Sequence, residues 1–286
     1  MSKRTIAVLA AAGALIAGCS DPGTDSSTDV VVDDRPEAVL SLSPTATETL
    51  FAVGAGDQVV AVDSQSDYPP NAPKTDLSAY TPSLEAIVGY KPDLVIASDD
   101  IDGLVAGLDA ADIPVLLLPA ATTIDDAYSQ IERIADATGH DAEGDALVVT
   151  TRERIDAAVA RAPRDEQRYF HELDSMLYTV TSQSFVGQIY GLFGLTSIAD
   201  GSAGGDYPQM SDEGVVAADP DIVFLADSQC CGETAESVAA RPGWSATTAV
   251  REGKIFAMDE DLSSRWGPRI ADQAEAVASL LVSGNP

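Results

Sequence analysis

Two glutamates occupy the same position in a short segment that this chain contains twice. Residues 83–98 read SLEAIVGYKPDLVIAS and residues 211–226 read SDEGVVAADPDIVFLA, with Glu85 and Glu213 at matching offsets. In each copy a serine stands two residues earlier, where it can cap the free N–H groups of a helix. A carboxylate in the first turn is ordinarily a favourable partner of the helix dipole. Its presence in both copies indicates a shared task for the two acids.

Cysteines are the next reactive side chains. Cys230 and Cys231 are neighbours, and Cys19 ends an apolar leader. In an oxidising compartment the neighbouring pair can form a disulfide, although adjacent α-carbons lie only about 3.8 Å apart, below the usual span of a disulfide. Two free thiols, or a site facing a soft metal or cobalt, are the alternatives.

Catalytic motifs are missing from the sequence. It contains no Gly-x-Ser-x-Gly elbow, and the run from His171 to Ser175 lacks the second histidine of a zinc-protease helix. Zinc and manganese sites favour histidine clusters, whereas this chain has only His140 and His171. An exported hydrolase is therefore disfavoured, and we expect no catalytic residues, no bound metal ion and no cofactor.

The first 35 residues read as targeting sequence rather than fold. Residues 1–19 combine a basic start, an apolar run and Leu15-Ile16-Ala17-Gly18-Cys19, which resembles the bacterial lipoprotein box in which the cysteine receives a lipid. Residues 20–35 are rich in Ser, Asp and Thr, so they predict a flexible tether. We expect a body anchored through Cys19 at the extracytoplasmic face of the cell membrane. An ordinary secretory signal is the alternative.

Charge excludes one class of partner. The chain carries 16 basic and 46 acidic residues, a formal net charge of −30. Recognition of a phosphate backbone depends on clusters of Lys and Arg, so nucleic acid is not an expected partner.

From Pro36 onward, short β-branched runs alternate with helical patterns, which predicts an α/β fold. The expected strands are 38–42, 59–62, 94–97, 115–118, 168–173, 221–225 and 254–258. The expected helices are 45–53, 83–89, 101–111, 124–138 and 271–282, with one longer helix over 141–161.

Each copy of the repeated segment predicts a helix, a Pro-Asp turn and a buried parallel strand. Two copies indicate two lobes of similar design, and the long helix between them is where a single connection would lie. We therefore expect an N-terminal lobe over 36–139, a linker helix over 140–164 and a C-terminal lobe over 165–286. In such sheets ligands bind beside the edge where strands end and helices begin.

Several short motifs, in order, resemble one family. These are Ser41-Leu42-Ser43-Pro44-Thr45-Ala46-Thr47-Glu48, Ser66-Asp67-Tyr68-Pro69, Ser83-Leu84-Glu85 through Lys91-Pro92-Asp93-Leu94-Val95-Ile96-Ala97, Tyr207-Pro208-Gln209-Met210-Ser211, Ala240-Arg241-Pro242-Gly243-Trp244 and Gly267-Pro268-Arg269-Ile270. Together they are similar to the substrate-binding lipoproteins of ABC importers for iron-siderophores and vitamin B12, a class III periplasmic-binding-protein family. The resemblance covers nearly everything after Arg35.

The resemblance implies two Rossmann-like lobes bridged by one helix, with a ligand cleft between them. It also implies a monomer that works with ABC permease subunits and their ATPase, and a glutamate on each lobe that pairs with permease arginines. Glu85 and Glu213 match those glutamates. The ligand would be an iron chelate or a cobamide. The alternatives are a haem receptor of the same family and a tethered sensing module without a transporter.

Loops that follow the strands should line the cleft. The expected ligand contacts are Ser43, Pro44, Thr45, Asp67, Tyr68, Tyr80 and Ser98 from the first lobe, with Tyr178, Phe185, Tyr207, Arg265 and Trp266 from the second. Basic groups are scarce there, so a neutral hydroxamate chelate or a corrinoid fits better than an anionic catecholate. Haem would require an axial His, Tyr or Met ligand. His171 and the tyrosines could supply one, so haem remains an alternative ligand.

Overall fold

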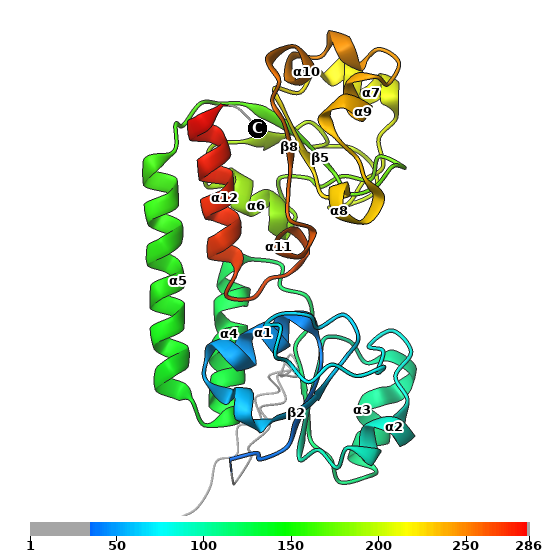
Figure 1. Cartoon of the computed structure of the whole chain (residues 1–286), viewed down its shortest axis with the longest axis vertical. Coiled ribbons are helices and arrows are strands. Elements are labelled where there is room, and N and C mark those ends of the chain that lie inside the picture. Colours follow the sequence, from blue (N-terminus) through cyan, green and yellow to red (C-terminus); the bar gives the residue numbers. More distant parts are fainter. Residues whose placement is uncertain (1–34, 285–286) are drawn as a thin grey trace, which may run out of the picture.

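Two α/β lobes are joined along one side by the long helix α5 (Asp141–Arg161), as Figure 1 shows. The computed structural model describes residues 35–284, and this architecture confirms the predicted fold class. The predicted signal peptide, its Cys19 and most of the predicted tether lie outside the described residues. Within residues 35–284, no helix has the length and apolar character that a bilayer crossing requires.

The N-terminal lobe is built on a parallel four-stranded sheet with the order β2-β1-β3-β4. Its strands are β1 (Val39–Leu42), β2 (Val59–Val62), β3 (Leu94–Ala97) and β4 (Val115–Leu117). Its helices are α1 (Pro44–Ala52), η1 (Ala55–Gln58), α2 (Leu84–Gly89), η2 (Ile101–Gly103), α3 (Leu104–Asp109) and α4 (Ile124–Thr138).

The C-terminal lobe repeats this topology, with the order β6-β5-β7-β8. Its strands are β5 (Arg168–Glu172), β6 (Thr196–Ser197), β7 (Ile222–Leu225) and β8 (Ile255–Ala257). Its helices are α6 (Phe185–Gly191), α7 (Asp212–Ala218), α8 (Ser228–Cys231), α9 (Ala235–Ala239), η3 (Trp244–Ala246), α10 (Thr248–Glu252), α11 (Glu260–Ser264) and α12 (Ile270–Ser283). The final helix, α12, packs along α5 (Figure 1).

The repeated segment forms α2 and β3 in one lobe and α7 and β7 in the other. Its Pro-Asp turn has the same function in both copies. Asp93 accepts hydrogen bonds from the backbone N–H groups of Glu37 and Ala38, and Asp221 accepts one from the N–H of Arg168. The aspartate of the repeat therefore fixes the start of the neighbouring central strand, β1 or β5.

Successive residues of a strand point to opposite sides of the sheet. Apolar clusters cover both sides, so both faces of each sheet are buried. Leu40 and Val95 face a cluster that belongs to the N-terminal lobe, and Phe170 and Val223 face one that belongs to the C-terminal lobe. The opposite faces of the two sheets contribute to a single apolar cluster that also includes α4, α5, α6 and α12. The lobes therefore share one interior on the side where the linker helix runs.

Candidate functional site

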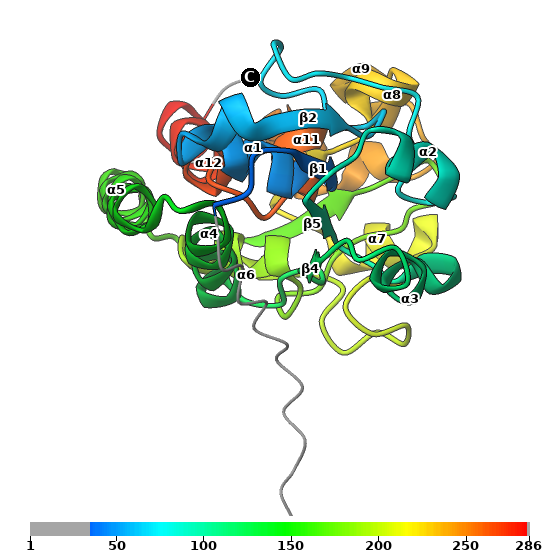
Figure 2. The same ribbon diagram turned by 90° about the horizontal axis from the view of Figure 1, so that it is seen from below.

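The two glutamates of the repeat lie at the exposed starts of equivalent short helices. The side chains of Ser83 and Ser211 each accept a hydrogen bond from the backbone N–H three residues later, so both serines are helix caps. Glu85 and Glu213 are exposed, and neither has a hydrogen bond or ion pair with any of residues 35–284. Helices α2 and α7 both lie on the side of the molecule away from α5 (Figures 1 and 2). Two unpaired carboxylates, one per lobe, are thus on the same side of the molecule.

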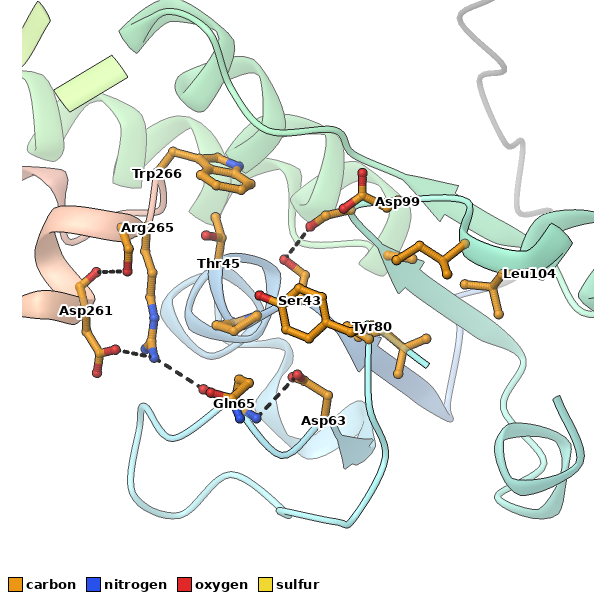
Figure 3. A pocket seen from close by; sticks show the side chains of 17 residues that line it. Ser43, Thr45, Asp63, Gln65, Tyr80, Asp99, Leu104, Asp261, Arg265 and Trp266 are labelled. Atoms are coloured by element: carbon orange, nitrogen blue, oxygen red, sulfur yellow. Dashed lines mark hydrogen bonds and ion pairs between the residues drawn. The ribbon is translucent and has the colours of Figure 1, made fainter. Parts of the chain in front are cut away.

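A cavity of about 270 Å³ opens beside the edge of the N-terminal sheet where β1 and β3 end (Figure 3). It is bounded by the turn into α1, by the loops around Tyr80 and Ser98, and by residues 261–266 of the C-terminal half. Its lining residues are Leu42, Ser43, Pro44, Thr45, Asp63, Gln65, Ala79, Tyr80, Ala97, Ser98, Asp99, Ile101, Leu104, Asp261, Ser264, Arg265 and Trp266.

More than half of the predicted ligand contacts meet at this cavity: Ser43, Pro44, Thr45, Tyr80, Ser98, Arg265 and Trp266. A hydrogen bond of 2.9 Å from the Ser98 hydroxyl to the Ser43 hydroxyl joins the loops that follow β3 and β1. Tyr80 is 75% exposed, so its ring is free to contact a ligand.

The remaining predicted contacts lie elsewhere. Asp67 binds Arg265, and the Tyr68 ring lies under the Arg269 guanidinium at 4.2 Å. Tyr178 and Tyr207 are exposed on the C-terminal lobe but do not line the cavity. Phe185 is 7% exposed and packs in the apolar cluster shared by the lobes.

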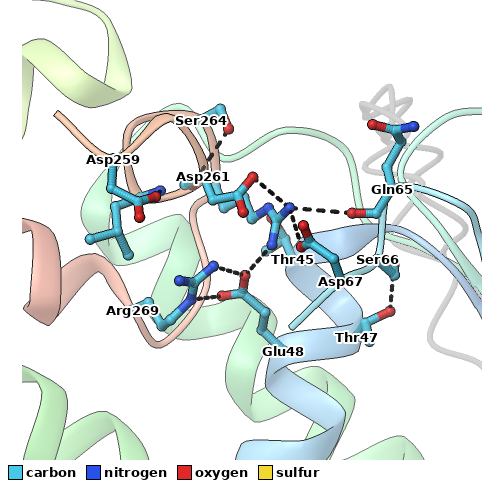
Figure 4. A network of polar contacts seen from close by, with 12 residues as sticks. Thr45, Thr47, Glu48, Gln65, Ser66, Asp67, Asp259, Asp261, Ser264 and Arg269 are labelled. Atoms are coloured by element: carbon cyan, nitrogen blue, oxygen red, sulfur yellow. Dashed lines mark hydrogen bonds and ion pairs between the residues drawn. The ribbon is translucent and has the colours of Figure 1, made fainter. Parts of the chain in front are cut away.

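A buried carboxylate, which the sequence did not identify as a site residue, connects the two halves of the chain. Glu48 of α1 is 3% exposed, and it accepts hydrogen bonds from Arg265 Nη1 at 2.7 Å and from Arg269 Nε at 2.9 Å. Arg265 also donates to Asp67 and Asp261, at 2.8 and 2.7 Å. Figure 4 shows the acids converging from both halves. Burial lowers the pKa of Arg265, but its bonds to Glu48 and Asp67 outweigh that effect and raise it, so this side chain stays cationic.

The charge of the cavity follows from this network. Arg265 is the single cationic side chain among the lining residues, and its guanidinium is already bound to carboxylates. Asp63, Asp99 and Asp261 also line the cavity. An anionic group of a ligand would therefore meet carboxylates and no uncommitted arginine.

A second acidic group lies at the end of β5 and β7 in the C-terminal lobe. Arg241 donates two hydrogen bonds to Glu172, which is fully buried, and one to Glu233. Asp227 is also fully buried, and neither of its carboxylate oxygens has a hydrogen-bond partner within residues 35–284. Burial, reinforced by repulsion from Glu172, raises the pKa of Asp227 to about 7.

Neither histidine reaches the cavity. His171 is fully buried, its Nδ1 lies 2.8 Å from the Tyr190 hydroxyl, and burial lowers its pKa to about 4. His140 immediately precedes α5, and its Nε2 contacts Arg35 at 2.6 Å. Among residues 35–284, no group of three His, Cys, Asp or Glu side chains is arranged to hold a metal ion. Tyr80 is the cavity residue that could offer an oxygen ligand to a haem iron.

Cys230 and Cys231 are joined by a disulfide in the structure, with α-carbons 3.8 Å apart. Both cysteines belong to the one-turn helix α8 and are exposed. The backbone N–H groups of Gln229 and Cys230 each donate to Glu260 Oε1 at 2.7 Å. The pair therefore lies in a turn that is bound to the start of α11.

Most of the chain matches the sequence model of a known protein family. Residues 39–262 match the model of the periplasmic binding protein family. The matched range contains Glu48, Glu85 and Glu213, together with much of the cavity lining.

Individual relatives are similar over most of their length. The cobalamin-binding protein of Halobacterium salinarum is 32% identical, over 91% of this chain and 74% of its own. The uncharacterized ABC transporter substrate-binding lipoprotein YvrC of Bacillus subtilis is 28% identical, over 96% of this chain and 95% of its own. Among solved structures, the periplasmic heme-binding protein HutB of Vibrio cholerae superposes with a TM-score of 0.77 at 25% identity, covering 85% of this chain and 98% of its own.

Replacing Glu48 by glutamine should destabilise the protein strongly, because two largely buried arginines would lose their shared carboxylate. Breaking a buried ion pair from one side costs about 3–5 kcal/mol. Urea unfolding followed by circular dichroism measures the change. As a control, Asp125→Asn removes an exposed ion pair with Arg152 and should cost less than about 1 kcal/mol. Equal losses in the two variants would contradict the importance of Glu48.

Asp227→Asn should stabilise the protein at pH 8 and change little at pH 4.5. The folded-state pKa of Asp227 is raised from 3.8 to about 7, so folding favours the neutral carboxyl. This group therefore lowers stability progressively as the pH rises from about 4 to about 7, and an amide removes the penalty. Melting temperatures at the two pH values test the effect, with the exposed Asp165→Asn as the control. A shift of equal size at both pH values would refute the assignment.

Proposed function

The chain belongs to the periplasmic binding protein family, and we propose that it captures a cobamide or an uncharged iron chelate outside the cytoplasm and delivers it to an ABC permease. The names of its relatives support the transport part of this proposal, since one is an ABC transporter substrate-binding lipoprotein and another a cobalamin-binding protein. The function is binding and delivery, with no chemical change to the ligand.

The choice of ligand rests on Arg265, the one cationic side chain in the described cavity lining, whose charge is already neutralised by carboxylates. Arg265 and Arg269 both bind Glu48, and three aspartates line the same cavity. A corrin ring with amide side chains, or a hydroxamate chelate without net negative charge, meets no repulsion there. A catecholate chelate, or the propionates of haem, would face those carboxylates without a free cation. Tyr80 and Trp266 add aromatic surface for a bulky, partly apolar ligand.

The cavity holds only part of such a ligand. Its volume of about 270 Å³ is slightly below the range of typical small-molecule sites. We propose that the remainder of the ligand contacts the C-terminal lobe through Tyr178 and Tyr207, whose rings are exposed. This is the sandwich arrangement expected for a cleft between two lobes.

Haem is the second candidate ligand, because a heme-binding protein shares this fold with a TM-score of 0.77. Against it, both histidines lie away from the cavity, which leaves the Tyr80 phenol as the axial ligand within the described lining. We therefore place haem after the cobamide.

Glu85 and Glu213 are proposed as the docking contacts with the permease, one from each lobe. Their exposure, their lack of partners within residues 35–284 and their common side of the molecule support this role. Charged contacts at the rim of an interface act mainly on docking rate and register. We further propose that Cys19 carries a lipid anchor and that residues 20–35 connect it to the body, which the lipoprotein name of one relative supports.

Ligand identity is tested by titrating the purified protein with cyanocobalamin, haem, a ferric hydroxamate and a ferric catecholate, following tryptophan fluorescence and visible absorbance. We expect binding of cyanocobalamin or the hydroxamate and none of the catecholate. Tyr80→Ala should weaken binding roughly tenfold, the usual effect of removing a well-packed aromatic contact. Tyr90→Ala, on an exposed ring outside the cavity, is the control. Tightest binding of haem or the catecholate would contradict the charge argument.

Docking is tested by Glu85→Arg combined with Glu213→Arg, measured by uptake in cells and by ligand titration. We expect uptake to be lost while ligand affinity changes less than about twofold. Glu143→Arg with Glu153→Arg makes the same charge change on exposed positions of α5, on the opposite side of the molecule. Normal uptake in the first variant would refute the docking roles of Glu85 and Glu213.

A further inference from the structure

The disulfide turn and the ligand cavity are connected through a single side chain. Glu260 is the first residue of α11, and its Oε1 accepts the backbone N–H groups of Gln229 and Cys230 at 2.7 Å each. Both donors belong to α8, the turn that contains the Cys230–Cys231 disulfide. The carboxylate of Glu260 therefore holds α11 against this turn.

The rest of α11 and the two residues after it form part of the cavity wall. Asp261 and Ser264 of α11 line the cavity, and so do Arg265 and Trp266, which follow directly. Asp261 accepts a hydrogen bond from Arg265 at 2.7 Å, and Arg265 continues to Glu48. Figure 3 shows this wall beside the other cavity residues, and Figure 4 shows its polar contacts. A short helix thus runs from the disulfide turn to the ligand site.

Helix α8 depends on constraints beyond its own backbone hydrogen bonds. It spans four residues, and a single helical turn is not stable by itself, because fixing the backbone costs more entropy than one hydrogen bond returns. The bonds that close it run from Cys231 N–H to the Asp227 carbonyl and from Gly232 N–H to the Ser228 carbonyl, both at 3.1 Å. A disulfide between adjacent residues closes a small ring around their peptide bond, so it restricts the backbone of this turn directly.

We propose that the Cys230–Cys231 disulfide is a redox-responsive site and that Glu260 is the positioning residue that transmits its state to the ligand cavity. This inference rests on the proposed role of that cavity as a ligand site. A dithiol reductant donates two electrons and two protons: the bond between the two cysteine sulfurs breaks, both become thiols, and the reductant closes its own disulfide. Without the disulfide the turn samples more conformations, so the Gln229 and Cys230 N–H groups donate to Glu260 for less of the time. With these hydrogen bonds weakened, α11 and the cavity wall become more mobile.

Exposure makes the exchange feasible. Both cysteines are exposed, so a thiolate can attack either sulfur, and exposed disulfides are generally the labile ones. Structural disulfides protected in a core resist the same reagents. In its oxidised form the protein would bind its ligand tightly, and under reducing conditions it would release it more readily.

Hydrogen exchange measured by mass spectrometry tests the connection without any ligand. The intact protein is compared before and after treatment with dithiothreitol, with alkylation to count free thiols. We expect faster exchange in peptides that cover residues 228–232 and also in those that cover 259–266. Cys230→Ser with Cys231→Ser should show the fast pattern with or without the reductant, and Glu260→Ala, which removes the acceptor, should show it at 259–266 while oxidised. Glu236→Ala, at an exposed acid on α9, is the matched control and should behave as the wild type.

The outcomes separate this inference from the proposed function. Unchanged exchange at 259–266 after complete reduction would overturn the connection, as would an equal response to dithiothreitol in the double serine variant. If the serine variant fails to fold, the reduced wild type still supplies the comparison. With cyanocobalamin or another binding probe, reduction should weaken affinity roughly fivefold or more. A redox response at 259–266 without binding of any probe would support the connection and refute the ligand assignment.

Discussion

The buried carboxylate of Glu48 needs both Arg265 and Arg269 as partners, and the contact between the two halves of the chain depends on this interaction. Glu48 is 3% exposed, so leaving it unpaired would carry a large desolvation penalty. Its partners, Arg265 and Arg269, come from the segment that leads into α12, and α12 packs along the linker helix. Because both guanidinium groups are committed to Glu48, that segment has to lie against α1, where it becomes a wall of the cavity. The same interaction therefore sets the shape of the site and removes its positive charge.

The repeated segment is the part of the fold that could be predicted best from the sequence. Its helix, Pro-Asp turn and strand recur as equivalent elements of two sheets with the same strand order, and its serines cap their helices. Long apolar strands such as β3 and β7 were predictable because burial on both faces leaves a continuous hydrophobic run. Strand β6 was not predicted, because two residues are too short to show any periodicity. Helix α6 was also missed, since its mixture of apolar and small residues has no clear amphipathic pattern.

The functional site was less predictable, because its decisive contacts join distant positions. Glu48 and Arg265 are 217 positions apart, and neither residue alone signals the other. Glu260 binds backbone N–H groups, which every residue but proline offers, so no side-chain pattern could reveal that contact. Phe185 illustrates the opposite problem: an aromatic residue after a strand is equally consistent with a cleft wall and with a core, and here it lies in the core. The loops that follow β1 and β3 were predictable as cavity walls from the geometry of parallel sheets alone.

The apolar interior that runs through both lobes has a consequence for how such proteins diversify. Val39 of the first sheet and Phe224 of the second belong to one cluster, with Ile155 of α5 and Val277 of α12. Neither lobe encloses a complete interior, so neither is a module that recombination could exchange without its counterpart. The cavity residues Ser43, Tyr80 and Ser98 lie outside this cluster, so they are free of the restriction. Ligand preference can therefore change at those positions, while the shared interior changes only through compensated substitutions.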